Sequence, residues 1–363
     1  MIQQTVIGNM KSQPEVLKYT LEHQNVFVDP FVEIFRKHDI RKVFFFGSGT
    51  SYNVSQIAAY YFKQIVGIDA SAQYPTVYRN YEKPDWTGML SSEQILYVGI
   101  SQSGTSVSTC EVMEFAKANG YQTLAITGNL ESRIAEFVDT AVHLLVGDEL
   151  TPPETKGYTV SVLSVYLWAI AVAKEKGVYT QEQYDAALAE AGELVDNFQT
   201  VVEESEAWYD RNKVSIVGSD RLYVLGYGVD YGSMLEGVLK IGEMLRLPIA
   251  GYELEEFSHG PTMALNRMQT LFMIGSDDAE FARMMEFRSV YKKYTPRIHV
   301  ITCKEIDADE RDMVFSIKAN KYLAPLMYTV PFQFVAAKGA KEVHIDTNIN
   351  PFEEPMAHYP AAE

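Results

Sequence analysis

Short, almost unbroken apolar runs recur along the chain and alternate with segments of helix-forming composition. A first set of runs covers residues 42–49, 95–104, 123–129 and 141–147, and a second set covers residues 221–228, 269–277, 297–305 and 324–337. Continuous apolar strands that alternate with helices are typical of parallel sheets covered on both faces. The pattern therefore predicts an α/β protein.

The two sets of runs indicate an internal duplication. The first set opens with Gly47-x-Gly49 and the second with Gly226-x-Gly228, and in both a tyrosine stands three residues after the second glycine. We predict two doubly wound parallel-sheet domains of the flavodoxin-like kind, with flanking helices. The predicted boundaries are an N-terminal helical segment over 1–40, a first domain with linking helices over 41–205, a second domain over 206–340 and a C-terminal tail over 341–363.

Composition and charge narrow the classes of function. The chain has 363 residues, 47% of them hydrophobic, and a formal net charge of −17. A strongly acidic chain without a basic cluster disfavours a nucleic-acid or anionic-membrane surface. Cys110 and Cys303 lie far apart with no paired spacing, which argues against a disulfide framework or a zinc site and fits a reducing compartment. No leader-like or membrane-spanning run is evident, so we expect a cytoplasmic protein with neither metal nor cofactor.

Hydroxyl side chains crowd the end of one predicted strand, where residues 100–108 read "ISQSGTSVS". We call residues 101–106 the hydroxyl loop. Ligands of doubly wound sheets bind where such a loop leads into a helix N-terminus, which attracts phosphate without lysine or arginine. A helix N-cap is the plainer interpretation. The corresponding second-domain segment, "IGSDDAEFA", is acidic, which favours an anion site in the first domain alone.

The sequence lacks the two common nucleotide-binding patterns, which narrows the kind of anion that this loop is expected to bind. Neither a P-loop nor a dinucleotide-binding glycine pattern is present,. We therefore expect a small phosphorylated metabolite rather than a nucleotide.

A second segment carries candidate acid and base groups. Glu236, Lys240 and Glu243 share one face of a predicted helix, and His259 precedes Gly-Pro in a predicted loop. A carboxylate and an imidazole together could move a proton beside a carbonyl or imine carbon. The plainer alternatives are a solvent-exposed salt-bridge stripe and a turn or interface histidine.

Five motifs now support a resemblance to a known family. "GSGTSYN", "ISQSGTS", "PPETKGYT", "LEGVLKIGE" and "EFSHGP" occur in the order found in tandem SIS (sugar isomerase) proteins. The chain resembles the isomerase half of glucosamine-6-phosphate synthase and, more closely, the fructosamine- and glucoselysine-6-phosphate deglycases. The resemblance implies a sugar-phosphate site formed by Thr50, Ser51, Ser101, Gln102, Ser103 and Ser106.

The same resemblance implies catalytic roles and an assembly. Glu243 would shuttle a proton between C1 and C2 of the sugar, and Lys240 would lie near the sugar. His259 would open the sugar ring from the partner subunit, which implies a homodimer.

Two departures from the synthase shape the expected reaction. We expect no glutaminase domain, and residues 342–363 contain no lysine to match the one that forms a Schiff base in the synthase. We therefore expect a deglycase that cleaves a 6-phosphorylated sugar–amino acid conjugate to sugar 6-phosphate and free amino acid. The alternatives are an amino-sugar-6-phosphate isomerase or deaminase, and a non-catalytic sugar-phosphate sensor.

The C-terminal tail is expected to lie over the active site. Glu353, Glu354, His358 and Tyr359 are its candidates for contacting the amine. Simple docking or disorder is the plainer interpretation of a terminal segment.

Overall fold

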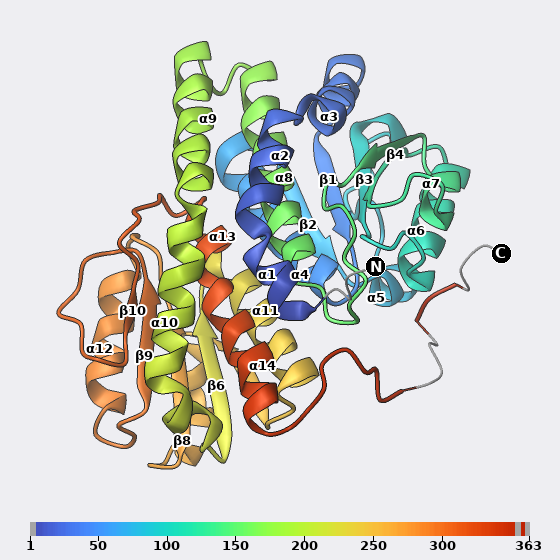
Figure 1. Cartoon of the computed structure of the whole chain (residues 1–363). Helices are drawn as coiled ribbons and strands as arrows, with labels where there is room; N and C mark the ends of the chain where they lie inside the picture. The colour runs from blue at the N-terminus through green and yellow to red at the C-terminus, as the bar shows by residue number, and fades with distance from the viewer. Residues whose placement is uncertain (1–4, 353–356, 360–363) are drawn as a thin grey trace. The chain divides into compact units, whose positions relative to one another are not determined.

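The computed structural model of the chain describes residues 5–352 and 357–359 (Figure 1). Its residues group into two compact units that interleave along the sequence. The first-sheet unit comprises 15–148, 156–192 and 351–363, and the second-sheet unit comprises 1–14, 149–155 and 193–350. Each unit contains one five-stranded parallel sheet.

The first sheet has the strand order β2-β1-β3-β4-β5, and every pair is parallel. Its strands are β1 (Lys42–Phe46), β2 (Asp69–Gln73), β3 (Ile95–Ile100), β4 (Gln122–Thr127) and β5 (Thr140–His143). All four apolar runs of the first set are therefore strands. This order is the doubly wound, flavodoxin-like order, in which ligands bind at the carboxyl ends of β1 and β3.

Helices cover both faces of the first sheet. They are α3 (Asn25–Lys37), α4 (Thr50–Tyr61), the π-helix Phe62–Val66, α5 (Pro75–Tyr81), α6 (Val107–Ala118), α7 (Arg133–Glu136) and α8 (Lys156–Glu175), with the short 3₁₀ turn Ser92–Gln94 before β3. Phe44 and Phe46 face α5 and α6, whereas Phe45 between them contacts Phe62 on the opposite face. The period of two along β1 thus places one core on each side of the sheet.

Helix α8 is apolar on all sides and forms the centre of one of these cores. Phe31 stacks on Trp168 with ring centroids 4.2 Å apart, and the indole nitrogen of Trp168 donates to the carbonyl oxygen of Phe27 at 2.9 Å. By length and composition α8 could cross a membrane, yet 94% of its apolar window is buried inside the protein. A helix that is hydrophobic all round is typical of a domain core.

The second sheet repeats the strand order of the first. Its order, β7-β6-β8-β9-β10, is again parallel throughout. Its strands are β6 (Arg221–Gly226), β7 (Ile249–Glu253), β8 (Gln269–Ile274), β9 (Ile298–Thr302) and β10 (Met313–Val314). The predicted pair of flavodoxin-like sheets is confirmed, and the matching order supports the inferred duplication.

One predicted strand is wrong. Residues 324–337 form α13 (Ala324–Tyr328) and the start of α14 (Val330–Glu342) instead of a fourth strand. The run is 14 residues long, which suits a buried helix better than a strand. Pro325 and Pro331 each stand in the first turn of a helix, where the missing N–H costs nothing,.

Helices also cover both faces of the second sheet. Its unit contains α1 (Val6–Lys11), α10 (Phe198–Val217), α11 (Asp230–Met244), α12 (Phe281–Tyr291), α13 and α14, with 3₁₀ turns at Glu256–His259 and Pro261–Ala264. The helices α2 (Gln13–Glu22) and α9 (Gln181–Asp196) continue from one unit into the other along the chain. Leu271 and Met273 of β8 pack with the α12 side chains, whereas Phe272 meets Trp208 of α10 and Phe332 of α14.

The strands that the sequence pattern missed are all edge strands. β2, β7 and β10 lie at the margins of the two sheets, and their residues are only partly buried. A strand with one open side does not need a continuous apolar run, so the signal that identified the central strands is absent from these three.

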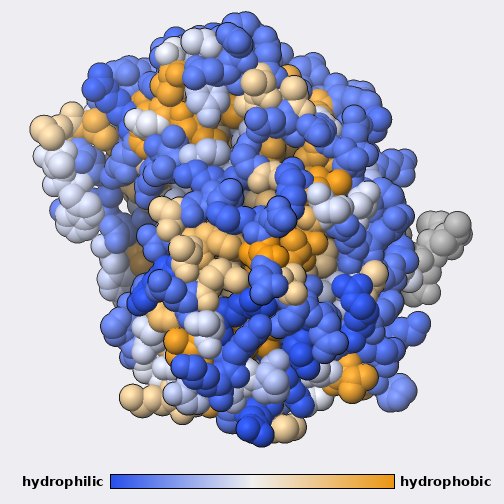
Figure 2. Space-filling model, turned by 90° about the vertical axis from the view of Figure 1, so that its left-hand side faces the viewer, coloured by the Kyte–Doolittle hydropathy of each residue, from blue (hydrophilic) through white to orange (hydrophobic). Residues whose placement is uncertain are grey.

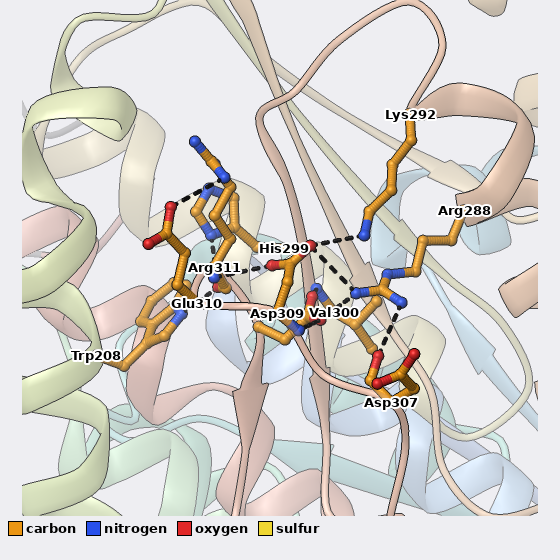
Figure 3. A network of polar contacts seen from close by, with 10 residues as sticks. Trp208, Arg288, Lys292, His299, Val300, Asp307, Asp309, Glu310 and Arg311 are labelled. Carbon is orange, nitrogen blue, oxygen red and sulfur yellow. Dashed lines mark hydrogen bonds and ion pairs between the residues drawn. The ribbon is translucent and has the colours of Figure 1, made fainter.

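A buried polar network anchors the loop between β9 and β10 (Figure 3). Arg288 of α12 forms ion pairs with Asp309 and Asp312, and Asp312 accepts the backbone N–H of Val300 at 2.9 Å. On the other face of the sheet, the carbonyl oxygen of Arg311 accepts from Trp208 at 2.7 Å and from Nδ1 of His299 at 2.8 Å.

His299 in this network is fully buried and neutral. Because a carbonyl only accepts, Nδ1 carries the proton, and Nε2 has no hydrogen-bond partner among the described residues. Burial lowers the pKa of His299 to about 4,.

The neutral state of His299 predicts a loss of stability in mild acid. The unfolded chain binds a proton at this histidine from about pH 6.5 downward, while the native chain binds it only near pH 4,. The contribution of His299 to stability is therefore complete above about pH 6.5 and falls below it. Between pH 7 and pH 5 this histidine should cost about 2 kcal/mol of unfolding free energy, measurable by urea unfolding as the difference between wild type and a variant without it, because a buried carboxyl group with a raised pKa, such as Asp230, acts in the opposite direction.

A matched pair of variants isolates this effect. His299→Phe places a ring beside Trp208 and Phe272 and leaves Arg311 its bond from Trp208, so it should remove the share of the pH dependence that the histidine contributes. His344→Asn, at an exposed histidine of the same unit, should leave the dependence unchanged. An equal slope in His299→Phe and wild type would contradict the assignment.

Candidate functional site

The loop after β1 brings small polar residues to the carboxyl edge of the first sheet. Gly49 has φ = 57°, a left-handed conformation that favours glycine,. A Cβ on Gly47 would lie 2.5 Å from the backbone of Ser51, so the loop can close only around glycine. Thr50 then begins α4 and is buried, while Ser51 is half-buried beside it.

The hydroxyl loop lies at the end of the adjacent strand β3 and leads into α6. Hydrogen bonds within the loop fix its conformation. The N–H of Gly104 donates to Oγ of Ser101 at 3.1 Å, and the Thr105 hydroxyl donates to Oγ of Ser103 at 3.1 Å. Gly104 has φ = 66°, and a Cβ there would collide with Ser132. Ser106 is the N-cap residue of α6.

A cluster of serine hydroxyls joins these two loops. Ser106 donates to Oγ of Ser48 at 3.5 Å, and Ser48 lies 3.4 Å from Oγ of Ser108. The structure therefore brings the predicted residues of both loops to one edge of one sheet. Ser48 and Ser108 were not predicted, although both lie inside the quoted hydroxyl-rich segments.

The described end of the tail lies on the hydroxyl loop. The N–H of Val107 donates to the carbonyl oxygen of Ala357 at 3.0 Å, and the N–H of Tyr359 donates to that of Thr105 at 2.8 Å. Nδ1 of His358 lies 3.2 Å from the Thr105 hydroxyl. His358 and Tyr359 therefore lie at the loop, whereas Glu353 and Glu354 fall outside the described residues.

The matching edge of the second sheet is occupied by the protein's own carboxylate. Asp230 begins α11, is buried, and accepts the backbone N–H of Ser276 at 2.9 Å. Burial raises the pKa of Asp230 to about 7. An incoming anion would meet this group together with the acidic residues 277 and 278, so the second sheet has no equivalent of the hydroxyl loop.

A buried lysine organises α11. The Nζ atom of Lys240 lies 3.5 Å from Glu236 and 2.9 Å from Glu243. The side chains of Glu236 and Lys240 are 0% and 2% exposed, so the plainer prediction of a solvent-exposed stripe is wrong for these two. Glu243 is 36% exposed and projects from the cluster.

Burial is the largest single influence on Lys240 and lowers its pKa. The charges of Glu236 and Glu243, with that of Glu154, outweigh burial, so the pKa of Lys240 is raised overall and the ammonium stays charged.

A third carboxyl group, which the sequence did not reveal, joins this cluster. Glu154 interacts electrostatically with Lys240, Glu236 and Glu243, and burial raises its pKa to about 7 while Lys240 opposes the rise. Glu154 lies inside the quoted segment "PPETKGYT", but it is far from α11 in sequence. Among the described residues, no set of three His, Cys, Asp or Glu side chains is arranged to hold a metal ion.

His259 stands apart from the Lys240 cluster. It ends the 3₁₀ turn Glu256–His259, which is anchored by buried Phe257 and capped by Glu253, whose carboxylate accepts the N–H groups of Glu255 and Glu256. The ring of His259 is exposed, and no described residue forms a hydrogen bond with it. No hydrogen bond or ion pair joins it to Glu243 within the described chain.

A pocket of about 620 Å³ borders the His259 turn. It lies between residues 258–265 and α12, and it is lined in part by Met263, Val290 and Tyr294. These three side chains are exposed, Met263 to 94%. Figure 2 shows patches of exposed hydrophobic residues on a face that is largely hydrophilic.

Comparison with known proteins matches residues 38–171 to the SIS domain family. The chain is 27% identical over 339 residues to a glutamine–fructose-6-phosphate aminotransferase (isomerizing) of Fusobacterium nucleatum and 25% identical over 338 residues to that of Bartonella henselae. These matches cover 91% and 90% of this chain. The chain spans about half the length of these relatives, 54% of each.

Solved structures share the whole fold. A candidate phosphosugar isomerase from Clostridium difficile superimposes with a TM-score of 0.87 at 25% identity and covers 97% of both chains. The C-terminal domain of glucosamine-fructose-6-phosphate aminotransferase from Francisella tularensis gives 0.83 at 20% identity over 95% of this chain and 98% of that one. Glucosamine-6-phosphate deaminase from Thermotoga maritima gives 0.75 at 21% identity over 96% and 98%. The last two likenesses concern the fold alone.

The placement of Gln102 generates a prediction about Gly157, the second residue of α8. A Cβ on Gly157 would collide with the side-chain amide of Gln102. Because that amide is the end of a flexible side chain, Gly157→Ala should fold normally but displace Gln102. If the edge of the first sheet binds a sugar phosphate, glucose 6-phosphate should bind about tenfold more weakly, by calorimetry, because the displaced amide loses its hydrogen bond to the ligand.

Gly192→Ala provides the control. Its Cβ would meet only Leu21, at 3.9 Å, so binding should be unchanged and the helix slightly stabilised. Unaltered binding in Gly157→Ala would remove Gln102 from the site.

Proposed function

We propose that this chain, which contains a SIS domain over residues 38–171 and is homologous to about half of the glutamine–fructose-6-phosphate aminotransferases, is a deglycase of amine-linked sugar 6-phosphates. Its products are sugar 6-phosphate and a free amino acid. The observation that carries the proposal is the carboxylate of Glu243, held by a buried ammonium and open to solvent.

The hydroxyl loop supports phosphate binding. It offers Ser101, Ser103 and Ser106 at the N-terminus of α6, where the helix dipole favours an anion,. Thr50, Ser51 and Gln102 complete the proposed sugar-phosphate site. Neutral donors suit a chain of net charge −17, because they need no basic pocket.

The reaction needs one base and one water molecule. Glu243 removes the proton from the carbon that bears nitrogen, which gives an enaminol, and the proton returns to the adjacent carbon to give an imine. Water adds across the imine and the C–N bond breaks, which releases the amine and the sugar aldehyde. In this scheme Lys240 orients Glu243 through their 2.9 Å contact, and His259 assists ring opening.

Two related activities are the alternatives to a deglycase. An isomerase or a deaminase of amino-sugar 6-phosphates would use the same proton transfer. The Thermotoga maritima structure with this fold is a glucosamine-6-phosphate deaminase. A sensor, in contrast, would bind sugar phosphate without turnover.

We also propose a homodimer in which His259 of the partner subunit completes each site. The exposed ring of His259 has no hydrogen-bond partner among the described residues, and exposed apolar side chains line the adjacent pocket. Both features suit a surface that a second copy covers.

The first test is a Glu243→Gln variant with a substrate panel. We expect turnover to fall by about 10²- to 10⁴-fold, because a positioned base is lost, while sorbitol 6-phosphate binding is unchanged. The panel contains 6-phosphorylated fructosyl-amino acids and amino-sugar phosphates, and products are identified by mass.

The exposed Glu310, 83% accessible, supplies a control as Glu310→Gln, which should behave as wild type. Release of ammonia instead of an amino acid would favour the deaminase. Full activity of Glu243→Gln would exclude this glutamate as the base.

Complementation tests the proposed dimer. Glu243→Gln and His259→Ala should each be inactive alone. If His259 acts across the interface, a mixed dimer has one intact site, and an equal random mixture should recover about one quarter of wild-type activity. Dimers that mix without any recovery would place His259 and Glu243 in the same chain.

A further inference from the structure

A stacked pair of tyrosines lies at the carboxyl edge of the first sheet, outside the set of predicted site residues. The rings of Tyr52 and Tyr74 are nearly parallel, at 16°, and their centroids are 3.8 Å apart. Tyr52 is buried, and its hydroxyl accepts from the side-chain amide of Gln56 at 2.6 Å. Tyr74 is 51% exposed. The pair therefore presents one supported aromatic ring to solvent.

The backbone on both sides of Tyr74 restricts where its ring can lie. Tyr74 follows the last residue of β2, Gln73, which pairs with Phe46 at the end of β1. Pro75, the first residue of α5, favours an extended conformation for the residue before it, and Tyr74 has φ = −70° and ψ = 123°. An aromatic ring that is already ordered loses little entropy when a ligand packs on it.

This position adjoins the proposed sugar-phosphate site. Because the last residues of β1 and β2 pair, Gly47 and Tyr74 leave the sheet side by side. Gly47 opens the loop that carries Thr50 and Ser51, and Tyr52 directly follows Ser51. The stacked pair thus borders the loop after β1.

The strand order gives the direction in which a bound sugar would extend. The hydroxyl loop follows β3, the loop with Thr50 and Ser51 follows β1, and Tyr74 follows β2, in that order along the edge. Neighbouring strands are about 4.8 Å apart, so the ends of β3 and β2 are about 10 Å apart, a distance that an extended sugar phosphate can bridge. On the other side of β3 the edge is closed, because the N–H of Gly128 donates to the carbonyl oxygen of Gln102 at 2.9 Å. A sugar whose phosphate lies on the hydroxyl loop would therefore direct its opposite end, which carries the amine, toward Tyr74.

The surface beside Tyr74 is apolar. Val77 lies on the first turn of α5 and is 42% exposed. Arg79 is the one charged residue in the α5 sequence, and it forms an ion pair with Glu111 of α6. An uncharged aromatic ring flanked by an aliphatic side chain suits an aromatic or other large apolar group.

We propose that Tyr74 binds the side chain of the amino acid to which the sugar phosphate is linked, and that it favours amino acids with aromatic or other large apolar side chains over glycine. This inference rests on the proposed function, because it assumes a substrate whose amine belongs to an amino acid. The ring of Tyr52 supports one face of Tyr74, so an incoming aromatic side chain would extend the stack. Tyr74 determines specificity in this role and takes no part in the proton transfer.

Binding to an inactive variant tests the inference without requiring turnover. In a Glu243→Gln background, calorimetry compares 6-phosphorylated fructosyl-phenylalanine, 6-phosphorylated fructosyl-glycine and fructose 6-phosphate, each with and without Tyr74→Ala. We expect Tyr74→Ala to weaken the phenylalanine conjugate about tenfold, because a stacked aromatic pair is lost together with its buried area. The glycine conjugate and fructose 6-phosphate should bind as before. Tyr74→Phe, which keeps the ring, should keep the preference for phenylalanine.

Tyr19 supplies a matched control in the same unit. It is also 51% exposed and also stacks on a ring, that of His23, with centroids 4.1 Å apart. It belongs to α2 rather than to the carboxyl edge of the sheet. Tyr19→Ala should leave all three affinities unchanged, which separates the loss of any exposed stacked ring from the loss of a contact with the ligand.

Three outcomes would overturn the inference. Equal weakening of all three ligands by Tyr74→Ala would make Tyr74 a support of the loop after β1, and an unchanged preference would place the amino acid elsewhere. Failure of all three ligands to bind would remove the sugar-phosphate site and this inference with it. Failure of wild type to turn over any amine conjugate would count against the proposed deglycase alone, since the binding comparison still reports whether Tyr74 contacts the conjugate.

Discussion

The second-sheet unit contains a positive charge that is almost completely shielded from water, and the arrangement of α11 depends on it. The ammonium of Lys240 is almost fully buried, and a buried charge is tolerated only when it is paired and hydrogen-bonded. Glu236, one turn earlier on the same helix, satisfies part of this requirement from a fully buried position. Glu243 satisfies the rest from the margin, where its carboxyl group is held by Lys240 and is still 36% exposed.

The two sheets share one strand order but differ in the polar groups at their carboxyl edges. In the second sheet, Asp230 fills the crevice with an internal carboxyl group. In the first, glycines at 47, 49 and 104 bring backbone and hydroxyl donors together without any cation. The proposed function accordingly assigns phosphate binding to the first sheet and the proton transfer to groups of the second.

Much of this arrangement could be predicted from the sequence, and the failures have physical causes. Central strands are buried on both faces and so show continuous apolar runs, whereas β2, β7 and β10 lie at edges and show none. The run 324–337 is equally apolar because α13 and α14 are buried. Motifs singled out Glu243 and the hydroxyl loop as candidates, but they could not single out Glu154, because its electrostatic interaction with Lys240 joins segments far apart in sequence.

The interleaving of the two units has a consequence for how the protein is made. Gln13 donates from its side-chain amide to Gln333 at 3.0 Å, a contact that spans 320 residues. During synthesis Gln13, at the start of α2, cannot form this contact until α14 has emerged. Val6 and Met10 of α1, which are buried in the folded protein, precede it in the chain. Contacts of such long sequence separation slow folding. The second-sheet unit therefore completes its core only near the end of synthesis, which makes the nascent chain a natural client for chaperones.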